Sequence, residues 1–160
     1  MRIVQIIDSL EVGGAEKMAI NYANALAKRI DFSGLIATRK EGDLKSQIDP
    51  NVDYLFLNKK STIDFKAAFQ LKSYSKKNKI EIVQPHSSSY FITFLLKMIY
   101  PRIKIIWHDH NGLSEFLDTK KWLPLKMASY FFKGIIVVND QLLHWAKREL
   151  HCKNIIYLPN

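Results

Sequence analysis

The sequence predicts an α/β protein in which helices flank both faces of a parallel sheet. Short apolar runs alternate with longer segments of helical periodicity along all 160 residues, an order typical of βαβ units. The composition, with 48% hydrophobic and 24% charged residues, is that of a globular protein. A chain of this length buries roughly two thirds of its unfolded surface, enough for one well-packed domain.

Seven apolar runs are the predicted strands, and seven strands make a complete Rossmann-like sheet. Those at residues 2–7, 103–108 and 134–138 are nearly continuous in Ile and Val, which predicts inner strands covered on both faces. The predicted strands are Arg2–Ile7, Phe32–Thr38, Asp53–Leu57, Glu81–Pro85, Ile103–His108, Gly134–Val138 and Asn154–Leu158.

The clearest helix follows the first strand, because apolar residues recur there every three or four positions. Its predicted buried face consists of Ala15, Met18, Ala19, Tyr22, Ala23, Leu26 and Ala27. The opposite, solvent-facing side carries Glu16, Lys17, Asn24 and Lys28. Further helices are predicted at Thr62–Lys76, Ser88–Ile99, Lys121–Phe132 and Asp140–Glu149.

Cysteine content and apolar run lengths indicate the compartment. The single cysteine, Cys152, has no partner for an internal disulfide, which favours a reducing environment. The start of the chain lacks the apolar stretch of a signal peptide. No apolar run approaches the roughly 20 residues that span a bilayer. We therefore expect a cytoplasmic protein, or a peripheral one at the inner face of the membrane.

The net charge of +9 predicts attraction to an anionic partner, such as nucleic acid, an acidic membrane or a phosphorylated small molecule. Charge alone does not choose among these, and scattered lysines can also serve only to solubilise helix faces. The basic residues are spread over nearly every segment. Since nucleic-acid-binding domains gather them on one face, we expect no nucleic-acid partner.

A pair of glycines marks the first loop that can bind a ligand. Gly13 and Gly14 lie where the first helix starts. Glycines allow close backbone approach, and the N–H groups of a helix N-terminus favour a phosphate. The dinucleotide fingerprint G-x-G-x-x-G is absent, which disfavours a nicotinamide cofactor. The alternative is that the pair serves only as a tight turn.

Polar loops follow the fourth and fifth predicted strands, with His86 and Ser87 after one and His108, His110 and Asn111 at the end of the other. In a parallel sheet both loops share the carboxyl edge with the glycines. Such groups hydrogen-bond sugar hydroxyls, and a histidine near its ordinary pKa moves protons at neutral pH. The alternative for a histidine at a strand end is a structural hydrogen bond.

The triplet His108-Asp109-His110 raises the question of a metal. Along a strand the two histidines face one way and Asp109 the other, and no fourth ligand has matching spacing. We therefore expect no metal.

An aromatic and basic stretch spans residues 115–133. It is compatible with a membrane-surface helix or an acceptor groove, and equally with an amphipathic helix packed on the sheet.

Five segments in order resemble the N-terminal half of family 4 glycosyltransferases, which are retaining enzymes of the GT-B fold. They are G-G-A-E, E-I-V-Q-P-H-S-S, K-I-I-W-H-D-H-N-G, G-I-I-V-V-N-D and N-I-I-Y-L-P-N. One departure is Asn139-Asp140, where the family often has Ser-Glu; it leaves the fold prediction unaffected.

The resemblance implies that residues 1–160 form the N-terminal, acceptor-side domain and that a nucleotide-sugar domain follows Asn160. It implies a hexosyltransferase type of enzyme for surface polysaccharide or glycolipid synthesis, with a nucleotide-sugar donor, a glycan or lipid-linked acceptor, and no metal or cofactor. Gly13 and Gly14 would approach the donor diphosphate, and His110, as the catalytic residue, the transferred sugar. The acceptor would be contacted by His86, Ser87, His108, Asn111 and Glu16.

Two consequences are open to test. Because a GT-B site lies between two domains, we expect the 160-residue chain to be inactive alone. The competing interpretation is a non-catalytic Rossmann-like module that binds a phosphate or nucleotide, which would leave the histidine loops without a function.

Overall fold

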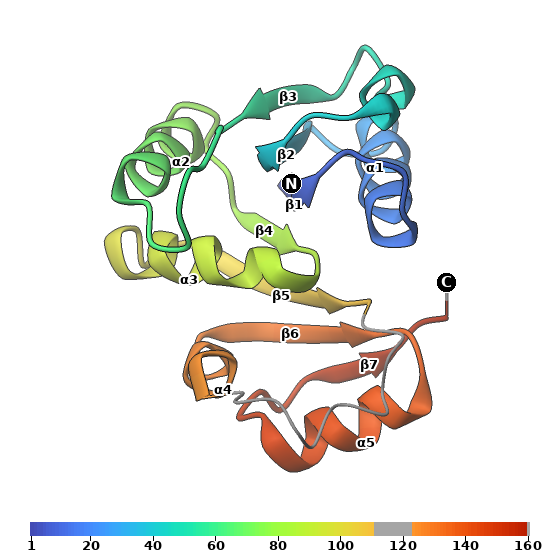
Figure 1. Ribbon diagram of the computed structural model, residues 1–160, viewed down its shortest axis with the longest axis vertical. Helices are drawn as coiled ribbons and strands as arrows, with labels where there is room; N and C mark the ends of the chain where they lie inside the picture. Colours follow the sequence, from blue (N-terminus) through green and yellow to red (C-terminus); the bar gives the residue numbers. More distant parts are fainter. Residues whose placement is uncertain (111–122, 160) are drawn as a thin grey trace.

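The computed structural model describes residues 1–110 and 123–159, and within these ranges it contains one parallel sheet of seven strands (Figure 1). All seven predicted strands are confirmed, with bounds that differ from the predictions by at most two residues. They are β1 Arg2–Ser9, β2 Phe32–Lys40, β3 Asp53–Phe56, β4 Ile82–Pro85, β5 Lys104–Asp109, β6 Phe132–Val137 and β7 Ile155–Tyr157.

The order of the strands is β3-β2-β1-β4-β5-β6-β7. The chain starts at β1, moves outward to β3, crosses back to β4 beside β1, and then continues outward to β7. The predicted inner position of β1, β5 and β6 is therefore confirmed. Gln5 of β1 pairs with Gln84 of β4 at the centre of the sheet.

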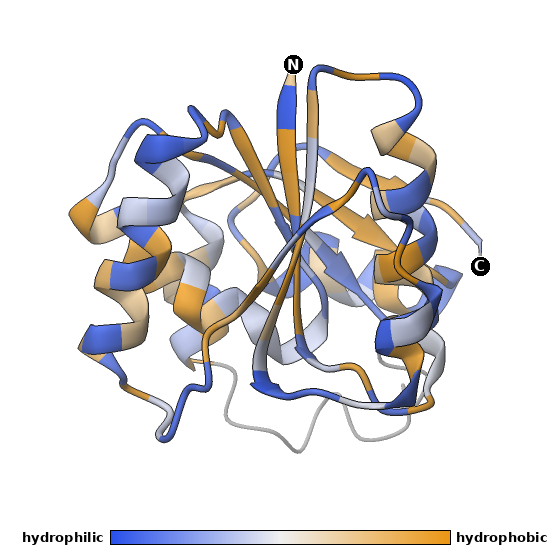
Figure 2. Cartoon of the chain, turned by 90° about the horizontal axis from the view of Figure 1, so that it is seen from above, coloured by the Kyte–Doolittle hydropathy of each residue, from blue (hydrophilic) through white to orange (hydrophobic). Residues whose placement is uncertain are grey.

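Helices cover the sheet on both sides (Figures 1 and 2). The helix α1 (Gly14–Ala27) packs with β1 and β2 into one apolar cluster, whereas the remaining helices share a second, larger cluster. These are α2 Phe65–Lys77, α3 Tyr90–Ile99, α4 Leu123–Ser129 and α5 Asp140–Glu149, with short 3-10 turns at Asp43–Gln47 and Ser87–Ser89. The strands at the centre of Figure 2 are mostly hydrophobic, as buried parallel strands require.

Side-chain caps explain where two helices begin. The Asp64 side chain accepts a hydrogen bond from the backbone N–H of Ala67 at 2.9 Å, so α2 starts at Phe65 rather than at the predicted Thr62. The start predicted for α5, at Asp140, is confirmed, because Asn139 caps that helix in the same way.

The predicted helix at Lys121–Phe132 is only partly confirmed. Lys121 lies outside the described residues, and α4 ends at Ser129. Phe132 instead opens β6, where it pairs with Ile105 and is buried. A phenylalanine at this position is compatible with the end of a helix or with the start of a strand. Its pairing with Ile105 places it in the strand β6.

The buried face of α1 is confirmed at Ala19 and Ala23, whereas Met18 and Tyr22 are half-buried. Ile20, which the pattern left off this face, is buried in the same cluster as Ile7.

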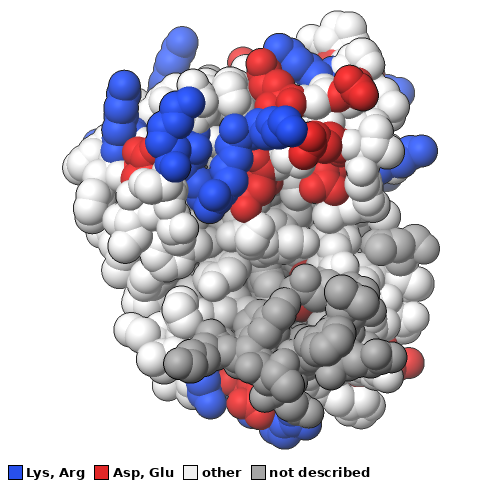
Figure 3. Space-filling view, in the orientation of Figure 1, with Lys and Arg blue, Asp and Glu red and all other residues white. Residues whose placement is uncertain are grey.

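On the face that Figure 3 shows, Lys and Arg lie mainly in the upper half, with Asp and Glu interspersed among them. Arg39 lies 3.7 Å from Asp8, and Lys45 lies 2.7 Å from Glu41. Among the described helices, none combines the length and apolar composition needed to cross a membrane.

Candidate functional site

The site lies where the chain reverses its direction across the sheet. After β1 the chain moves toward β2, and after the adjacent β4 it moves toward β5. In open α/β sheets ligands bind outside the carboxyl ends of the strands at such a reversal. The loops that leave β1, β4 and β5 at this edge carry Gly13–Gly14, His86–Ser89 and His110.

The two glycines form the start of α1. Gly13 precedes the helix with φ −167° and ψ 162°, an extended conformation open to any residue, and it has no side chain to cap the first turn. A Cβ on Gly14 would have no atom within 4 Å, and a Cβ on Gly13 would meet only the flexible carboxylate of Glu16. Backbone conformation therefore does not require glycine here. Their effect is to leave the helix N-terminus open, which suits an anionic ligand.

Asp8, which was not among the predicted site residues, connects β2, the segment after β3 and the 3-10 turn after β4 at this edge. Its carboxylate accepts hydrogen bonds from the Thr38 hydroxyl at 2.5 Å and the Ser88 hydroxyl at 2.7 Å. The Lys59 ammonium, on a nearly buried side chain, lies 4.0 Å away, and burial lowers the pKa of Lys59. The sequence signal that could have identified Asp8 is an acidic residue at the carboxyl end of a central strand.

Ser87 adopts the left-handed region with φ 47°, which is uncommon for a residue other than glycine. The Trp107 indole N–H donates to the Ser87 carbonyl at 2.9 Å, and His86 pairs with His108 in an isolated parallel bridge. The loop after β4 is therefore held against β5 despite its unfavourable backbone angle.

The three predicted histidines lie together in a buried chain of hydrogen bonds. His110 Nε2 lies 2.8 Å from His86 Nδ1, and His86 Nε2 lies 2.8 Å from Gln5 Oε1. The Gln5 amide donates to Gln84 Oε1 at 3.3 Å, and Gln84 Nε2 lies 3.4 Å from His108 Nδ1. We call these five residues the histidine–glutamine chain. Sequence reasoning found its histidines and missed its glutamines.

Burial separates the roles of the three rings. His86 and His108 are 0% and 1% exposed, whereas His110 is half-buried. The rings of His108 and His110 are 3.9 Å apart between centroids, and the Tyr22 ring packs on His108 at 5.6 Å. The side chains of His86 and His108 are therefore not exposed to an acceptor substrate in this structure.

All three histidines are held neutral. Burial first, and then the neighbouring His110 and His108, lower the pKa of His86 well below its usual value. Burial, followed by the effect of His110, lowers the pKa of His108 to about 3, and burial lowers the pKa of His110 to about 4. A histidine with so low a pKa is a weaker base than one near its ordinary pKa. At neutral pH it forms hydrogen bonds as an uncharged ring.

Acidification from pH 7.5 to pH 5.5 is expected to lower the free energy of unfolding. Histidines of the unfolded chain titrate near about pH 6.5, while His86, His108 and His110 stay neutral in the folded state. Their stabilisation is therefore present above about pH 6.5 and is lost as pH falls toward the folded pKa values, by up to about 1.4 kcal/mol per pH unit for each histidine. Urea-unfolding midpoints across this range measure the loss.

The matched variant is His110→Asn, which removes one of the three buried titrating groups and should flatten this slope. A midpoint that does not change between pH 7.5 and pH 5.5 would show that the rings are not buried neutral in solution.

The histidines also form a cluster whose ligand nitrogens all lie within 4.8 Å of one another. In the sequence only His108, Asp109 and His110 stand close enough together to suggest a metal site, and His86 lies more than 20 positions away. Two nitrogens on a tetrahedral zinc ion lie about 3.3 Å apart, whereas His110 Nε2 and His86 Nδ1 lie at 2.8 Å. That distance is a hydrogen bond, and the rings would have to separate to admit an ion.

Of the other predicted site residues, the structure describes Glu16 and Ser87 but not Asn111. Glu16 is half-buried beside Gly13, and Ser87 is half-buried. Asn111 and residues 115–122 lie outside the described part of the chain.

The described part of the aromatic and basic stretch is amphipathic. Leu125 and Phe132 are buried in the sheet-facing core, whereas Leu123, Met127 and Tyr130 are 66%, 54% and 66% exposed.

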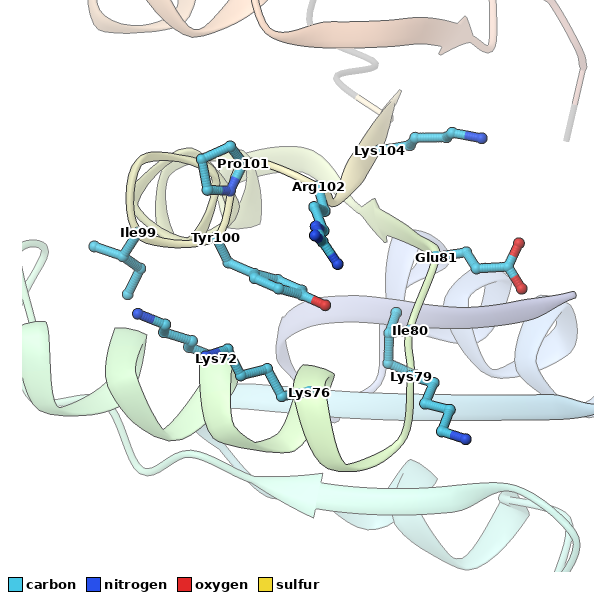
Figure 4. A pocket seen from close by; sticks show the side chains of 10 residues that line it. All are labelled: Lys72, Lys76, Lys79, Ile80, Glu81, Ile99, Tyr100, Pro101, Arg102 and Lys104. Carbon is cyan, nitrogen blue, oxygen red and sulfur yellow. The ribbon is translucent and has the colours of Figure 1, made fainter.

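A basic pocket of about 690 Å³ lies at the opposite, amino edge of the sheet (Figure 4). Its lining includes Lys72, Lys76, Lys79, Arg102 and Lys104. The pocket lies beside the ends of α2 and α3, and lysines near helix C-termini offset the helix dipole. It shares no lining residue with the glycine and histidine loops.

A family model described as Glycosyltransferase Family 4 matches residues 12–160. This range includes the glycine pair and all three histidines of the carboxyl edge. No curated protein matches the sequence.

Solved structures share the fold over the whole chain. HepE from Anabaena, solved in complex with UDP, is 13% identical with a TM-score of 0.74, covering 100% of this chain and 44% of HepE. Sucrose-phosphate synthase from Thermosynechococcus elongatus is 12% identical with a TM-score of 0.75, covering 99% and 48%. A glycosyltransferase from Rickettsia africae is 15% identical with a TM-score of 0.67, covering 99% and 43%. The chain therefore spans less than half the length of each.

Proposed function

The chain belongs to glycosyltransferase family 4, and we propose that it is the N-terminal, acceptor-side domain of a two-domain GT-B enzyme. That enzyme moves a hexose from a nucleotide sugar to a glycan or lipid-linked acceptor with retention of configuration. The observation that carries the proposal is the open N-terminus of α1 at Gly14, with no atom within 4 Å of a Cβ there. It lies at the same sheet edge as His110, where ligands of such sheets bind.

Two observations support a second domain beyond residue 160. The solved structures that share this fold are more than twice as long as this chain. At the edge of the sheet, Ile156 of β7 and Leu158, which follows that strand, are 57% and 42% exposed, and exposed apolar side chains close together can belong to an interface. The second domain would hold most of the nucleotide sugar.

The donor diphosphate would lie against the start of α1. No side chain caps the first turn of α1, and the space at Gly14 is open; the first-turn N–H groups with the helix dipole favour a negative charge. HepE was solved with UDP and also with UDP and glucose, which is consistent with a nucleotide sugar as donor. We propose that no metal or further cofactor takes part.

His110 would contact the transferred sugar as a neutral hydrogen-bonding group. Because its pKa is lowered to about 4, it is a weak base and stays uncharged at neutral pH. A hydrogen bond to a sugar hydroxyl needs no charge, and its value lies in positioning the sugar and stabilising the transition state.

Glu16, Ser87 and Asn111 are the acceptor contacts that we propose on this domain, with His86 and His108 supporting them from inside. We place the enzyme in surface polysaccharide or glycolipid synthesis, in the cytoplasm or at the inner face of the membrane. The exposed Leu123 and Met127 are of the kind that contacts a membrane surface.

The test is a transfer assay on the two-domain protein with a panel of nucleotide sugars and with free and lipid-linked acceptors. We expect one donor to be consumed and the new linkage, read by NMR, to keep the anomeric configuration of the donor. Nucleotide binding without transfer to any acceptor would instead favour the non-catalytic module, and an inverted linkage would contradict retention.

A further inference from the structure

We propose that the histidine–glutamine chain fixes the tautomer of His110, with the proton on Nε2 and a lone pair on Nδ1 for a sugar hydroxyl. Gln5 is then a positioning residue that acts through His86. The consequence for catalysis rests on the proposed function. The tautomer of His110 itself can be measured without any sugar transfer.

The direction of the chain follows from the orientation of the Gln5 amide, whose Oε1 faces His86. Gln5 Oε1 can only accept, so His86 Nε2 carries a proton and donates to it. His86 is neutral, so its Nδ1 is a lone pair and accepts. His110 Nε2, at 2.8 Å from that lone pair, must then be the donor. Since His110 is neutral as well, its Nδ1 carries no proton.

The other half of the chain agrees with this direction. Gln5 donates its amide N–H to Gln84 Oε1, and Gln84 then turns its own amide N–H toward His108 Nδ1 at 3.4 Å. His108 therefore also carries its proton on Nε2, and this buried N–H has no hydrogen-bond partner among the described residues. Reversing one glutamine alone would place two N–H groups or two oxygens against each other, so the chain can reverse only as a whole. The three tautomers are coupled, and they change together or not at all.

Burial makes this coupling strong. Gln5 and His86 are 0% exposed and Gln84 is 7% exposed, so water does not replace a lost partner and an unmade hydrogen bond is costly. The ring of Tyr22 lies 6.2 Å from that of His86 and 5.6 Å from that of His108, which closes the side next to α1. Among the described residues His110 Nδ1 is buried without a hydrogen-bond partner, so a hydroxyl that reaches it would satisfy an otherwise unpaired lone pair.

A lone pair on Nδ1 selects what His110 can recognise. It accepts a hydrogen bond from a hydroxyl, as on a sugar, and gives none to a phosphate oxygen. The opposite tautomer would donate to either a hydroxyl or a phosphate oxygen and would not discriminate between them. The chain therefore assigns His110 to the sugar and leaves the diphosphate to the N–H groups at Gly13 and Gly14.

The experiment reads the tautomers directly from the ring ¹⁵N resonances of the 160-residue chain at pH 7. We expect His86, His108 and His110 all to carry the proton on Nε2. A proton on Nδ1 of His110 would overturn the proposal. This measurement needs no substrate and no variant, so it stands even if no transfer is ever found.

Two matched substitutions test the mechanism of coupling. Gln5→Met removes the acceptor of His86, so His86 should turn its proton toward His110 and move the His110 proton to Nδ1. Gln84→Met is of the same size in the neighbouring strand and keeps the bond between His86 and Gln5. We expect it to leave the tautomer of His110 unchanged. An unchanged His110 tautomer in Gln5→Met would contradict the proposal.

In the two-domain enzyme, Gln5→Met should lower kcat about tenfold with the acceptor KM unchanged, and Gln84→Met should lower it less. Equal losses in both would indicate a merely structural role for Gln5. The last measurement records the ring ¹⁵N resonances after one equivalent of Zn²⁺ is added to the 160-residue chain. Shifts of all three histidine rings together would identify a metal site instead and overturn the proposal.

Discussion

His110→Ala in the two-domain enzyme is expected to lower kcat by about 100- to 1000-fold, the usual cost of removing one preorganised transition-state contact. His110 is the member of the histidine–glutamine chain that is only half-buried, and its Nδ1 has no partner among the described residues. Alanine removes that contact and also leaves the His86 ring without its partner at 2.8 Å. Steady-state kinetics with the preferred donor measure the loss.

Two further variants separate the contact from general damage. His110→Asn places an amide oxygen near the position of Nδ1 and should retain more activity than His110→Ala. His144→Ala removes an exposed histidine of α5 and should leave kcat unchanged. A His110→Ala enzyme with the wild-type rate would remove His110 from the site.

The 160-residue chain is expected to fold and to transfer no sugar. In the proposed site the described residues offer N–H groups for the diphosphate at the start of α1, Gly13–Gly14, and the basic pocket of about 690 Å³ lies at the other edge of the sheet. In the proposed enzyme the remaining groups that offset the charge of the departing diphosphate belong to the second domain. Each missing contact costs about two to three orders of magnitude in rate.

The measurement compares this chain and the two-domain protein at equal concentration, with the same nucleotide sugars and acceptors. Circular dichroism on the 160-residue chain confirms that it is folded when assayed. Comparable turnover by both proteins would mean that one domain holds the complete site, and the two-domain proposal would fail.

The fold could be predicted because its strands have a strong local signal. Runs such as residues 2–7 and 134–138 are apolar on both alternating faces, and only an inner parallel strand makes use of both. The strand order does not follow from such runs, but the right-handed crossover rule leaves few arrangements. Helix bounds were less predictable. Asp64 caps α2 through its side chain, and Phe132 became a strand residue through pairing with Ile105.

The candidate site was predictable in its position and only partly in its content. Residues after β1, β4 and β5 reach one edge in any parallel sheet, so Gly13 and His110 could be identified. Gln5 and Gln84 were overlooked, although a polar residue inside an apolar strand has to find a buried partner. The burial of His86 could not be predicted, because it depends on Tyr22 of α1, far away in the sequence.

The most direct test of the central claim, that the donor diphosphate lies against the start of α1, compares two variants of the two-domain enzyme. Gly14→Val fills the open space above the helix N-terminus, whereas Lys76→Ala with Lys79→Ala removes positive charge from the basic pocket at the opposite edge. We expect Gly14→Val to lower kcat/KM for the nucleotide sugar at least about tenfold and the lysine variant to match the wild type. A large loss of kcat/KM in the lysine variant, together with wild-type kcat/KM in Gly14→Val, would place the donor at the amino edge of the sheet. That result would contradict the claim that the diphosphate lies against the start of α1.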